Sequence, residues 1–150
     1  MGVLTDYFRA TDAGAVARTM GEGDSGPLEL EGAPFDGFAD KGLDPAVRLG
    51  VLVAVVRGVE WRPDLVGSRP VWPAVPEEAD SWVFELDAGV RDVLAAVPDA
   101  AVAGLAAEVV LTEDWAGTPV EDVRATLEDL IALSRRARDA GDLLYCWCTV

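Results

Sequence analysis

The sequence contains no histidine, only two cysteines and a single lysine, Lys41. Histidine is the commonest general acid–base residue and metal ligand in enzymes, so its absence argues against most hydrolase, transferase and metalloenzyme designs. Cys146 and Cys148 are too few to hold zinc, because no histidine or further cysteine completes the set of ligands. We therefore expect no metal site and no cofactor.

Long apolar runs are also missing. No uncharged stretch approaches the roughly 18 residues of a membrane-spanning helix, and the first residues lack the basic and apolar regions of a signal peptide. We expect a cytoplasmic protein. The 12 basic and 27 acidic side chains give a net charge of −15, which repels phosphate backbones and anionic lipids. Nucleic acid and membranes are therefore not expected as partners.

The sequence does contain enough apolar residues for one well-packed core. Hydrophobic residues make up 51% of the 150 residues, and a chain of this length buries about 70% of its unfolded surface. Because no repeat or linker divides the chain, residues 1–150 are predicted to form a single globular domain. The abundance of alanine, valine and arginine is typical of a GC-rich bacterial genome.

Periodicity and capping residues predict the elements of the first half. We expect a strand over 3–9, a helix from 11 or 12 to about 20, a short edge strand over 28–30 and a helix over 45–57. The last of these begins at Asp44 and is apolar all round, which predicts the most buried helix, although its valines also suit a strand. Residues 58–81 contain four prolines and are expected to hold little regular structure.

The second half is predicted to contain a strand over 81–86 and helices over 87–97 and 99–111. A capping-box pattern at 118–121 then opens a helix that ends at Gly141. The last segment, 143–149, is apolar on both faces, as in a central strand. Together these elements predict an α+β fold, in which a small mixed sheet includes the N-terminal and C-terminal strands and packs against about four or five helices.

This layout resembles that of the YfbM-like family of small bacterial proteins, a domain of unknown function. The likeness rests on the Met-Gly start before a short strand, on the Asp-Lys pair at 40–41, and on the run 133–141 before a terminal apolar strand. Family members usually carry Trp-His shortly after the Asp-Lys pair, whereas this sequence has Leu-Asp-Pro at 43–45 and no histidine. The resemblance therefore implies an α+β fold and carries over no catalytic residue.

Two motifs have both a chemical and a structural interpretation. The segment 21–26 matches the dinucleotide-binding pattern GxGxxG, but it follows a predicted helix, precedes Pro27 and places two carboxylates where pyrophosphate would lie, which favours a surface loop. Cys146 and Cys148 lie two apart on a strand and face the same side. We predict that both are reduced, buried core residues, with a reactive thiol as the alternative.

Acidic residues form two pairs that suit carboxylate chemistry. Asp36 with Asp40, and Glu113 with Asp114, have the residue types that glycosidases and magnesium-dependent enzymes use. Acidic residues in or beside loops are more often solvated turn formers. No residue is therefore assigned a catalytic role.

Tryptophans provide the stronger candidate. Trp61 and Trp72 lie in the proline-rich segment and Trp82 follows it, and large aromatics on a rigid loop anchor protein partners. The alternative is that these rings cover the core from outside. With Glu77 and Glu78 nearby, Trp61 and Trp72 are predicted to form a partner-binding surface on which at least one ring is partly exposed.

Two hypotheses for function follow. The first is a non-enzymatic, acidic protein-binding module that neutralises a basic protein partner, whose association the negative charge accelerates. The alternative is a small carboxylate-based hydrolase or ligand-binding protein. A flat acidic patch with tryptophan at its rim would favour the first, and a deep pocket with converging buried acids would favour the second.

Overall fold

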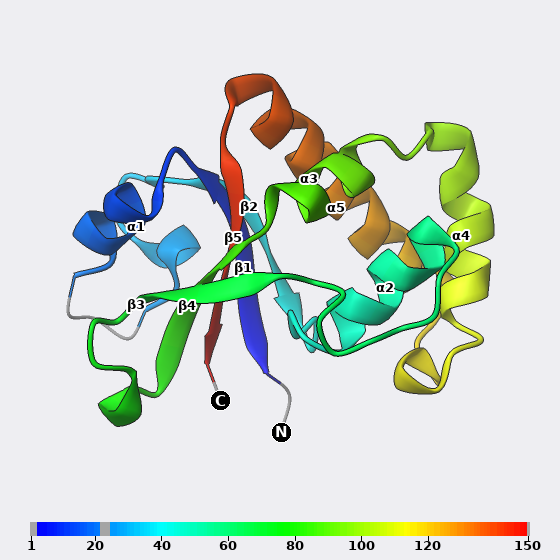
Figure 1. The fold of residues 1–150 in the computed structure, drawn as a ribbon, viewed down its shortest axis with the longest axis horizontal. Coiled ribbons are helices and arrows are strands. Elements are labelled where there is room, and N and C mark those ends of the chain that lie inside the picture. The colour runs from blue at the N-terminus through cyan, green and yellow to red at the C-terminus, as the bar shows by residue number, and fades with distance from the viewer. Residues whose placement is uncertain (1–2, 22–24, 150) are drawn as a thin grey trace.

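A five-stranded sheet organises the protein, which the computed structural model describes over residues 3–21 and 25–149 (Figure 1). Every pair of neighbouring strands is antiparallel. The predicted α+β class is confirmed, but the sheet is antiparallel throughout and not mixed. In order across the sheet, the strands are β2 (Asp36–Lys41), β1 (Leu4–Ala10), β5 (Leu143–Thr149), β4 (Ser81–Leu86) and β3 (Ser68–Trp72).

Strand β5 lies at the centre of this sheet, between β1 and β4. Leu144 and Cys146 belong to the hydrophobic cluster on one face, whereas Tyr145 and Trp147 belong to the cluster on the other, and all four are buried. A strand that is covered on both sides gains from apolar side chains at every position. The prediction of a central C-terminal strand is therefore confirmed.

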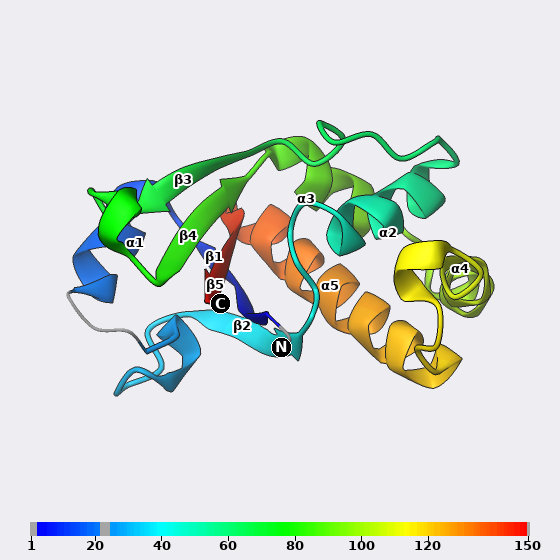
Figure 2. The same cartoon turned by 90° about the horizontal axis from the view of Figure 1, so that it is seen from below.

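Helices cover the two faces of the sheet unequally, as Figures 1 and 2 show. One face carries α1 (Ala13–Met20) and the short helix η1 (Pro27–Glu29). The other carries α2 (Arg48–Arg57), α3 (Ala88–Ala95), α4 (Val102–Val109) and α5 (Val120–Ala140). Further short helices, η2 (Pro76–Glu78), η3 (Asp99–Ala101) and η4 (Glu113–Trp115), connect the larger elements. Within the described ranges, no helix is long and apolar enough to cross a membrane.

The larger core lies between the sheet and α2 to α5. Helix α5 buries the apolar stripe that its sequence predicts, namely Val123, Leu127, Leu130, Ile131 and Ala137. Helix α2 buries six consecutive residues from Leu49 to Ala54, which agrees with the prediction of a helix that is apolar all round. Tyr7 of β1 faces this core, and its buried hydroxyl donates to the carbonyl of Leu43 at 2.5 Å.

The smaller core lies between the sheet and α1. Phe8 packs against Tyr145, with ring centroids 5.6 Å apart, and against Phe35, at 4.8 Å. Val16 and Met20 of α1 close over these rings. The same face carries the two hollows described below, because one short helix cannot cover the whole sheet.

Capping residues explain three of the helix boundaries. Asp12 accepts a hydrogen bond from the Ala15 amide at 2.8 Å and starts α1 as predicted. Asp44 accepts from the amides of Ala46 and Val47, so the turn that begins at Asp44 leads into α2, whose regular part starts at Arg48. Gly141 adopts a left-handed conformation, with φ of 73°, and ends α5.

The capping box predicted at 118–121 does not form. The Thr118 hydroxyl instead accepts a hydrogen bond from the Arg48 guanidinium at 2.9 Å, and Pro119 precedes the first turn of α5 without a side-chain cap. Arg48 also stacks on Trp115 with its guanidinium carbon 4.0 Å from the ring centroid. A tertiary contact thus takes the group that the local pattern assigned to the helix terminus.

Three short elements differ from the predictions. Residues 28–30 were expected as an edge strand, but Pro27 starts the short helix η1 there. Strand β2 was not predicted, because aspartate, glycine and lysine disfavour strands, and its pairing with β1 supplies what local propensity lacks. Strand β3 was not predicted either. It tolerates Pro70 because it lies at the edge of the sheet, where the register shifts between Pro70 and Trp72.

Gly37 of β2 provides a test of this packing. A Cβ at this position would overlap the carbonyl oxygen of Tyr7 and lie 2.8 Å from Cα of Phe8. We expect Gly37→Ala to lower the free energy of unfolding by about 2 kcal/mol. Gly104 of α4 is the matched control, because nothing lies within 4 Å of its Cβ position, and Gly104→Ala should raise stability by about 0.5–1 kcal/mol. Urea denaturation measures both, and a Gly37→Ala variant as stable as the parent would contradict the packing.

Candidate functional site

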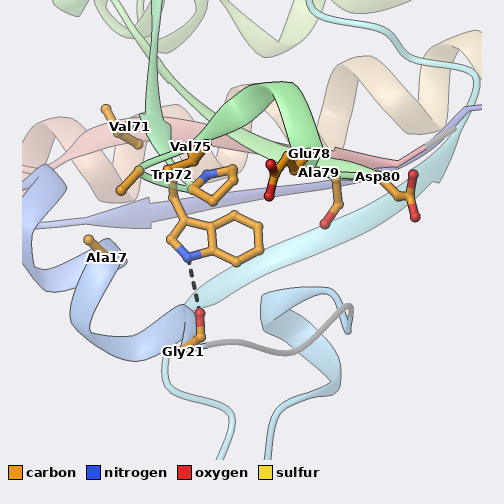
Figure 3. Close-up of a pocket in the computed structure, with 11 residues that line it drawn as sticks. Ala17, Gly21, Val71, Trp72, Val75, Glu78, Ala79 and Asp80 are labelled. Carbon is orange, nitrogen blue, oxygen red and sulfur yellow. Dashed lines mark hydrogen bonds between the residues drawn. The ribbon is translucent and has the colours of Figure 1, made fainter.

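A groove lies beside Trp72, between the end of α1, the edge strand β3 and η2 (Figure 3). We term it the Trp72 groove, and its volume is about 530 Å³. Its walls combine apolar side chains with acidic ones. They include Gly21, Trp72, Val75, Glu78 and Asp80. Of the four residues predicted to form a partner-binding surface, Trp72 and Glu78 line this groove, and Glu77 precedes Glu78 in η2.

Trp72 forms the centre of the groove. Its indole N–H donates to the carbonyl of Gly21 at 3.2 Å, which ties the edge strand to the end of α1 (Figure 3). The ring is partly buried against the smaller core. Val75 is 59% exposed beside it. The groove therefore presents a fixed aromatic ring together with an exposed aliphatic side chain.

Acidic side chains border this apolar surface. Glu77, Glu78 and Asp80 are exposed on η2 and just after it. None of the described residues that line the groove is basic. The Trp82 indole N–H donates to the Pro76 carbonyl at 3.1 Å and holds η2 against the sheet. The carboxylates thus lie on or next to a short helix that the Trp82 hydrogen bond holds against the sheet.

Trp61 lies elsewhere. It belongs to the segment after α2 and packs against Gly50 of that helix. A Cβ added at Gly50 would lie only 2.6 Å from Nε1 of Trp61. Helix α2 lies on the side of the sheet opposite α1 (Figure 2), and Trp61 lies on that side with it because its ring is next to Gly50. Trp61 is 40% exposed, as expected for at least one of the rings. The structure nevertheless separates Trp61 from Trp72, so the two do not form the single surface that the sequence analysis described.

A second hollow lies on the α1 face of the sheet, at the end where β1 begins and β5 ends. We term it the Asp6 cavity, and its volume is about 630 Å³. Strands β2, β1 and β5 form its floor, and residues 25–29 form its wall. Asp6 was not among the residues predicted from the sequence. The alternation of side chains along β1 could have indicated it, because Asp6 lies on the same face of the strand as Leu4 and the buried Phe8.

Asp6 is only 6% exposed. Burial raises the pKa of its carboxyl group above the ordinary value of 3.8, and the neighbouring charge of Glu29 adds to the increase. The amide of Leu28 lowers the same pKa in part, because it donates a hydrogen bond to Oδ2 at 3.3 Å. A carboxylate at such a position is destabilising while it is charged. Residues with this kind of perturbation are enriched at functional sites.

The carboxylate pairs proposed from the sequence do not converge. Asp36 forms ion pairs with Arg136 at 2.7 Å and Arg9 at 2.8 Å, and these lower its pKa. Asp40 accepts a hydrogen bond from Thr126 at 3.1 Å, while burial raises its pKa. Glu113 and Asp114 are exposed on η4. Among the described residues, no group of three or more potential ligands is arranged to hold a metal ion.

The cysteines are both free, and they differ in burial. Cys146 is fully buried, as predicted, whereas Cys148 is only partly buried because it lies near the end of β5. Burial raises the pKa of the Cys148 thiol to about 11. The prediction of a buried thiol is therefore confirmed for Cys146 and wrong in degree for Cys148.

Of the GxGxxG segment, residues 22–24 lie outside the described residues. Gly21 ends α1, and Gly26 precedes η1, whose three residues begin at Pro27. A dinucleotide-binding turn requires a strand before the glycines and a long helix after them. The described parts have neither arrangement.

Comparison with known proteins adds no relative. The scan against protein-family models finds no match, and the searches of curated proteins and of solved structures find none either. The resemblance to the YfbM-like family stays a prediction from the sequence. What can be said of function therefore depends on the geometry of the two hollows.

Replacing Asp6 tests the cost of its burial. Because the folded state holds the Asp6 proton more tightly than the unfolded chain, this carboxyl group reduces stability above its raised pKa, and the loss disappears as the pH falls below 3.8. We expect Asp6→Asn to unfold at higher urea concentration than the parent at neutral pH, with a difference that narrows near pH 4. Glu31→Gln, an exposed change of equal charge, is the control. A less stable Asp6→Asn variant at neutral pH would contradict the assignment.

Thiol labelling tests the environment of β5. A pKa of about 11 in place of 9.0 lowers the thiolate fraction of Cys148 at pH 8 by about 100-fold. Because thiols of higher pKa are intrinsically more nucleophilic, we expect labelling by Ellman's reagent to be at least about tenfold slower than for a free thiol. The folded Cys148→Ser variant should not react. Rapid labelling of both thiols in the folded parent would contradict the burial of the strand.

Proposed function

We propose that this domain is a non-enzymatic module that binds a basic protein partner at the Trp72 groove. The observation that carries the proposal is the combination found there: an anchored, partly exposed tryptophan and an exposed valine, bordered by the carboxylates of Glu78 and Asp80 and by no basic residue among the described lining residues. Tryptophan in such a setting is typical of residues that dominate binding energy.

Charge supports a basic partner. The chain carries a net charge of −15, so a positively charged protein is attracted from every direction and its association is accelerated. Such attraction alone is unspecific. The rigid apolar surface of Trp72 and Val75 supplies the local complementarity that selects one binding position.

The alternative, a carboxylate-based hydrolase, has weaker support. Hydrolysis by two acids requires carboxyl groups that face each other across a substrate, roughly 5–9.5 Å apart in glycosidases. Asp36 forms ion pairs with two arginines. Asp40 pairs with Thr5 in the sheet, and its side chain therefore lies on the face opposite that of Asp6, the next residue of β1.

Charge reversal tests the proposal without disturbing the core. The variant Glu77→Lys/Glu78→Lys changes two exposed side chains of η2, and Glu108→Lys/Glu113→Lys makes the same change of net charge on α4 and η4. A lysine-rich peptide that contains leucine is titrated into each ¹⁵N-labelled protein. We expect the parent to show shifts at the Trp72 indole and Gly21 signals, and the η2 variant to bind at least about tenfold more weakly than the control variant.

Two outcomes would overturn the proposal. Equal weakening by both double variants would show that the peptide responds to net charge alone. Shifts that avoid Trp72 and Gly21 would place the binding surface elsewhere. Added salt should slow association in every variant and leave the fold unchanged.

A further inference from the structure

We propose that the Asp6 cavity binds a small organic cation, an alkylammonium or guanidinium group that pairs with the Asp6 carboxylate. The inference does not depend on the proposed function, because it concerns a different hollow. Three observations carry it: a buried carboxylate that has no counterion among the described residues, the charges around it, and the space beside it.

Asp6 has no ion-pair partner among the described residues. Several other partly buried acids in or beside the sheet are neutralised, since Asp36 and Asp142 pair with Arg9 and Glu85 pairs with Arg69. Asp40 also lacks an ion pair within the described ranges, but it accepts a hydrogen bond from Thr126 on the other face. From the described residues, Asp6 accepts only the 3.3 Å hydrogen bond of the Leu28 amide, at Oδ2. A buried charge is normally paired, so an unpaired one that lines a cavity indicates that the partner arrives from outside.

The surrounding charges select a cation. Glu29 of η1 lines the same cavity and adds negative potential at Asp6. Lys41 is the one basic residue among the described lining residues. It lies at the exposed end of β2 and forms no ion pair within the described part of the chain. The Asp40 carboxylate points to the other face, where Thr126 donates to it. An anionic ligand would therefore meet two carboxylates and one exposed lysine.

Space for an apolar part of the ligand lies beside the carboxylate. Leu4, Ala39 and Trp147 line the cavity, and its volume of about 630 Å³ is within the range of roughly 300–1,000 Å³ that is usual for small-molecule sites. Gly26 brings the wall close to the floor, because a Cβ there would overlap Oδ2 of Asp6 and lie 3.1 Å from Cζ3 of Trp147. The backbone thus covers one oxygen of Asp6, and Oδ1 is the oxygen without a described partner.

The test compares probes of one shape and different charge. Phenethylammonium, neutral 2-phenylethanol and anionic 3-phenylpropionate are titrated into the ¹⁵N-labelled protein, with agmatine as the guanidinium probe, and the Leu28 amide and Trp147 indole signals are followed. We expect saturable millimolar binding of both cations and at least about tenfold weaker binding of the neutral and anionic probes.

Variants separate the carboxylate from bulk charge. Asp6→Asn keeps the size of the side chain and should weaken phenethylammonium at least about tenfold, whereas Glu31→Gln makes the same change of charge outside the cavity and should leave binding unchanged. Thermal unfolding of Asp6→Asn in the same buffer shows that it is folded. Equal affinity of the parent and Asp6→Asn, or equal affinity of the neutral and cationic probes, would overturn the proposal.

Two further arms identify the source of the cation. Magnesium chloride at equal ionic strength should not displace phenethylammonium, and full displacement with shifts at Leu28 would overturn the assignment to an organic cation. A peptide with one lysine is then added. If it shifts the Leu28 amide signal and competes with phenethylammonium, a side chain of a partner is the natural occupant. If it does not compete, a free amine is the occupant. The Glu77→Lys/Glu78→Lys variant should bind phenethylammonium like the parent, which keeps the outcome separate from that of the Trp72 groove.

Discussion

The burial of β5 on both faces is the constraint on which the rest of the structure depends. A strand with Leu144 and Cys146 on one side and Tyr145 and Trp147 on the other is stable only if both faces are covered. Helices α3 and α5 contact one face, with α2 and α4 packed against them, and a single short helix with η1 covers the other. The second face is therefore only partly covered, and both hollows lie at the edges of what α1 and η1 reach.

The α1 face carries the two hollows, whereas titratable groups lie on both faces of the sheet. On the side of α2 to α5, Asp40 has a raised pKa and accepts a hydrogen bond from Thr126, and Tyr7 donates its hydrogen bond to Leu43. On the side of α1, the same sheet carries Asp6 with a raised pKa and Trp72 at a groove. A buried carboxylate without a counterion lowers stability, and proteins commonly retain such a cost where a site needs it.

The sequence predicted the parts of the fold that strong local signals determine. The stripe of α5, the all-round apolar character of α2, the cap at Asp12, the glycine that ends α5 and the central position of β5 all follow from periodicity and capping. Strands β2 and β3 escaped prediction because their residues have poor strand propensity and their order comes from the neighbouring strand. Thr118 shows the converse case, in which a good local signal yields to Arg48, a residue far away in the sequence.

The sites were harder to predict than the fold, for a related reason. Trp72, Glu77 and Glu78 were selected because they are near each other in the sequence, and Trp72 and Glu78 do line one groove, whereas Trp61 was grouped with them on the same basis and lies on the other side of the sheet. Asp6 and Trp147 are 141 positions apart by their residue numbers and meet only because β1 pairs with β5. Alternation along β1 marks Asp6 as facing a core, but only the register brings the ring and the carboxylate together.

The two hollows are neighbours on the α1 face of the sheet. The Thr149 hydroxyl at the Asp6 cavity donates to the carbonyl of Asp80 at the Trp72 groove, at 2.9 Å, and Ser81 pairs with Thr149 across β4 and β5. A basic chain bound along the groove would pass close to a cavity that accepts one cationic group. Affinity would then come from Trp72 and specificity from the enclosed carboxylate, since an unpaired buried charge discriminates more sharply than exposed ones.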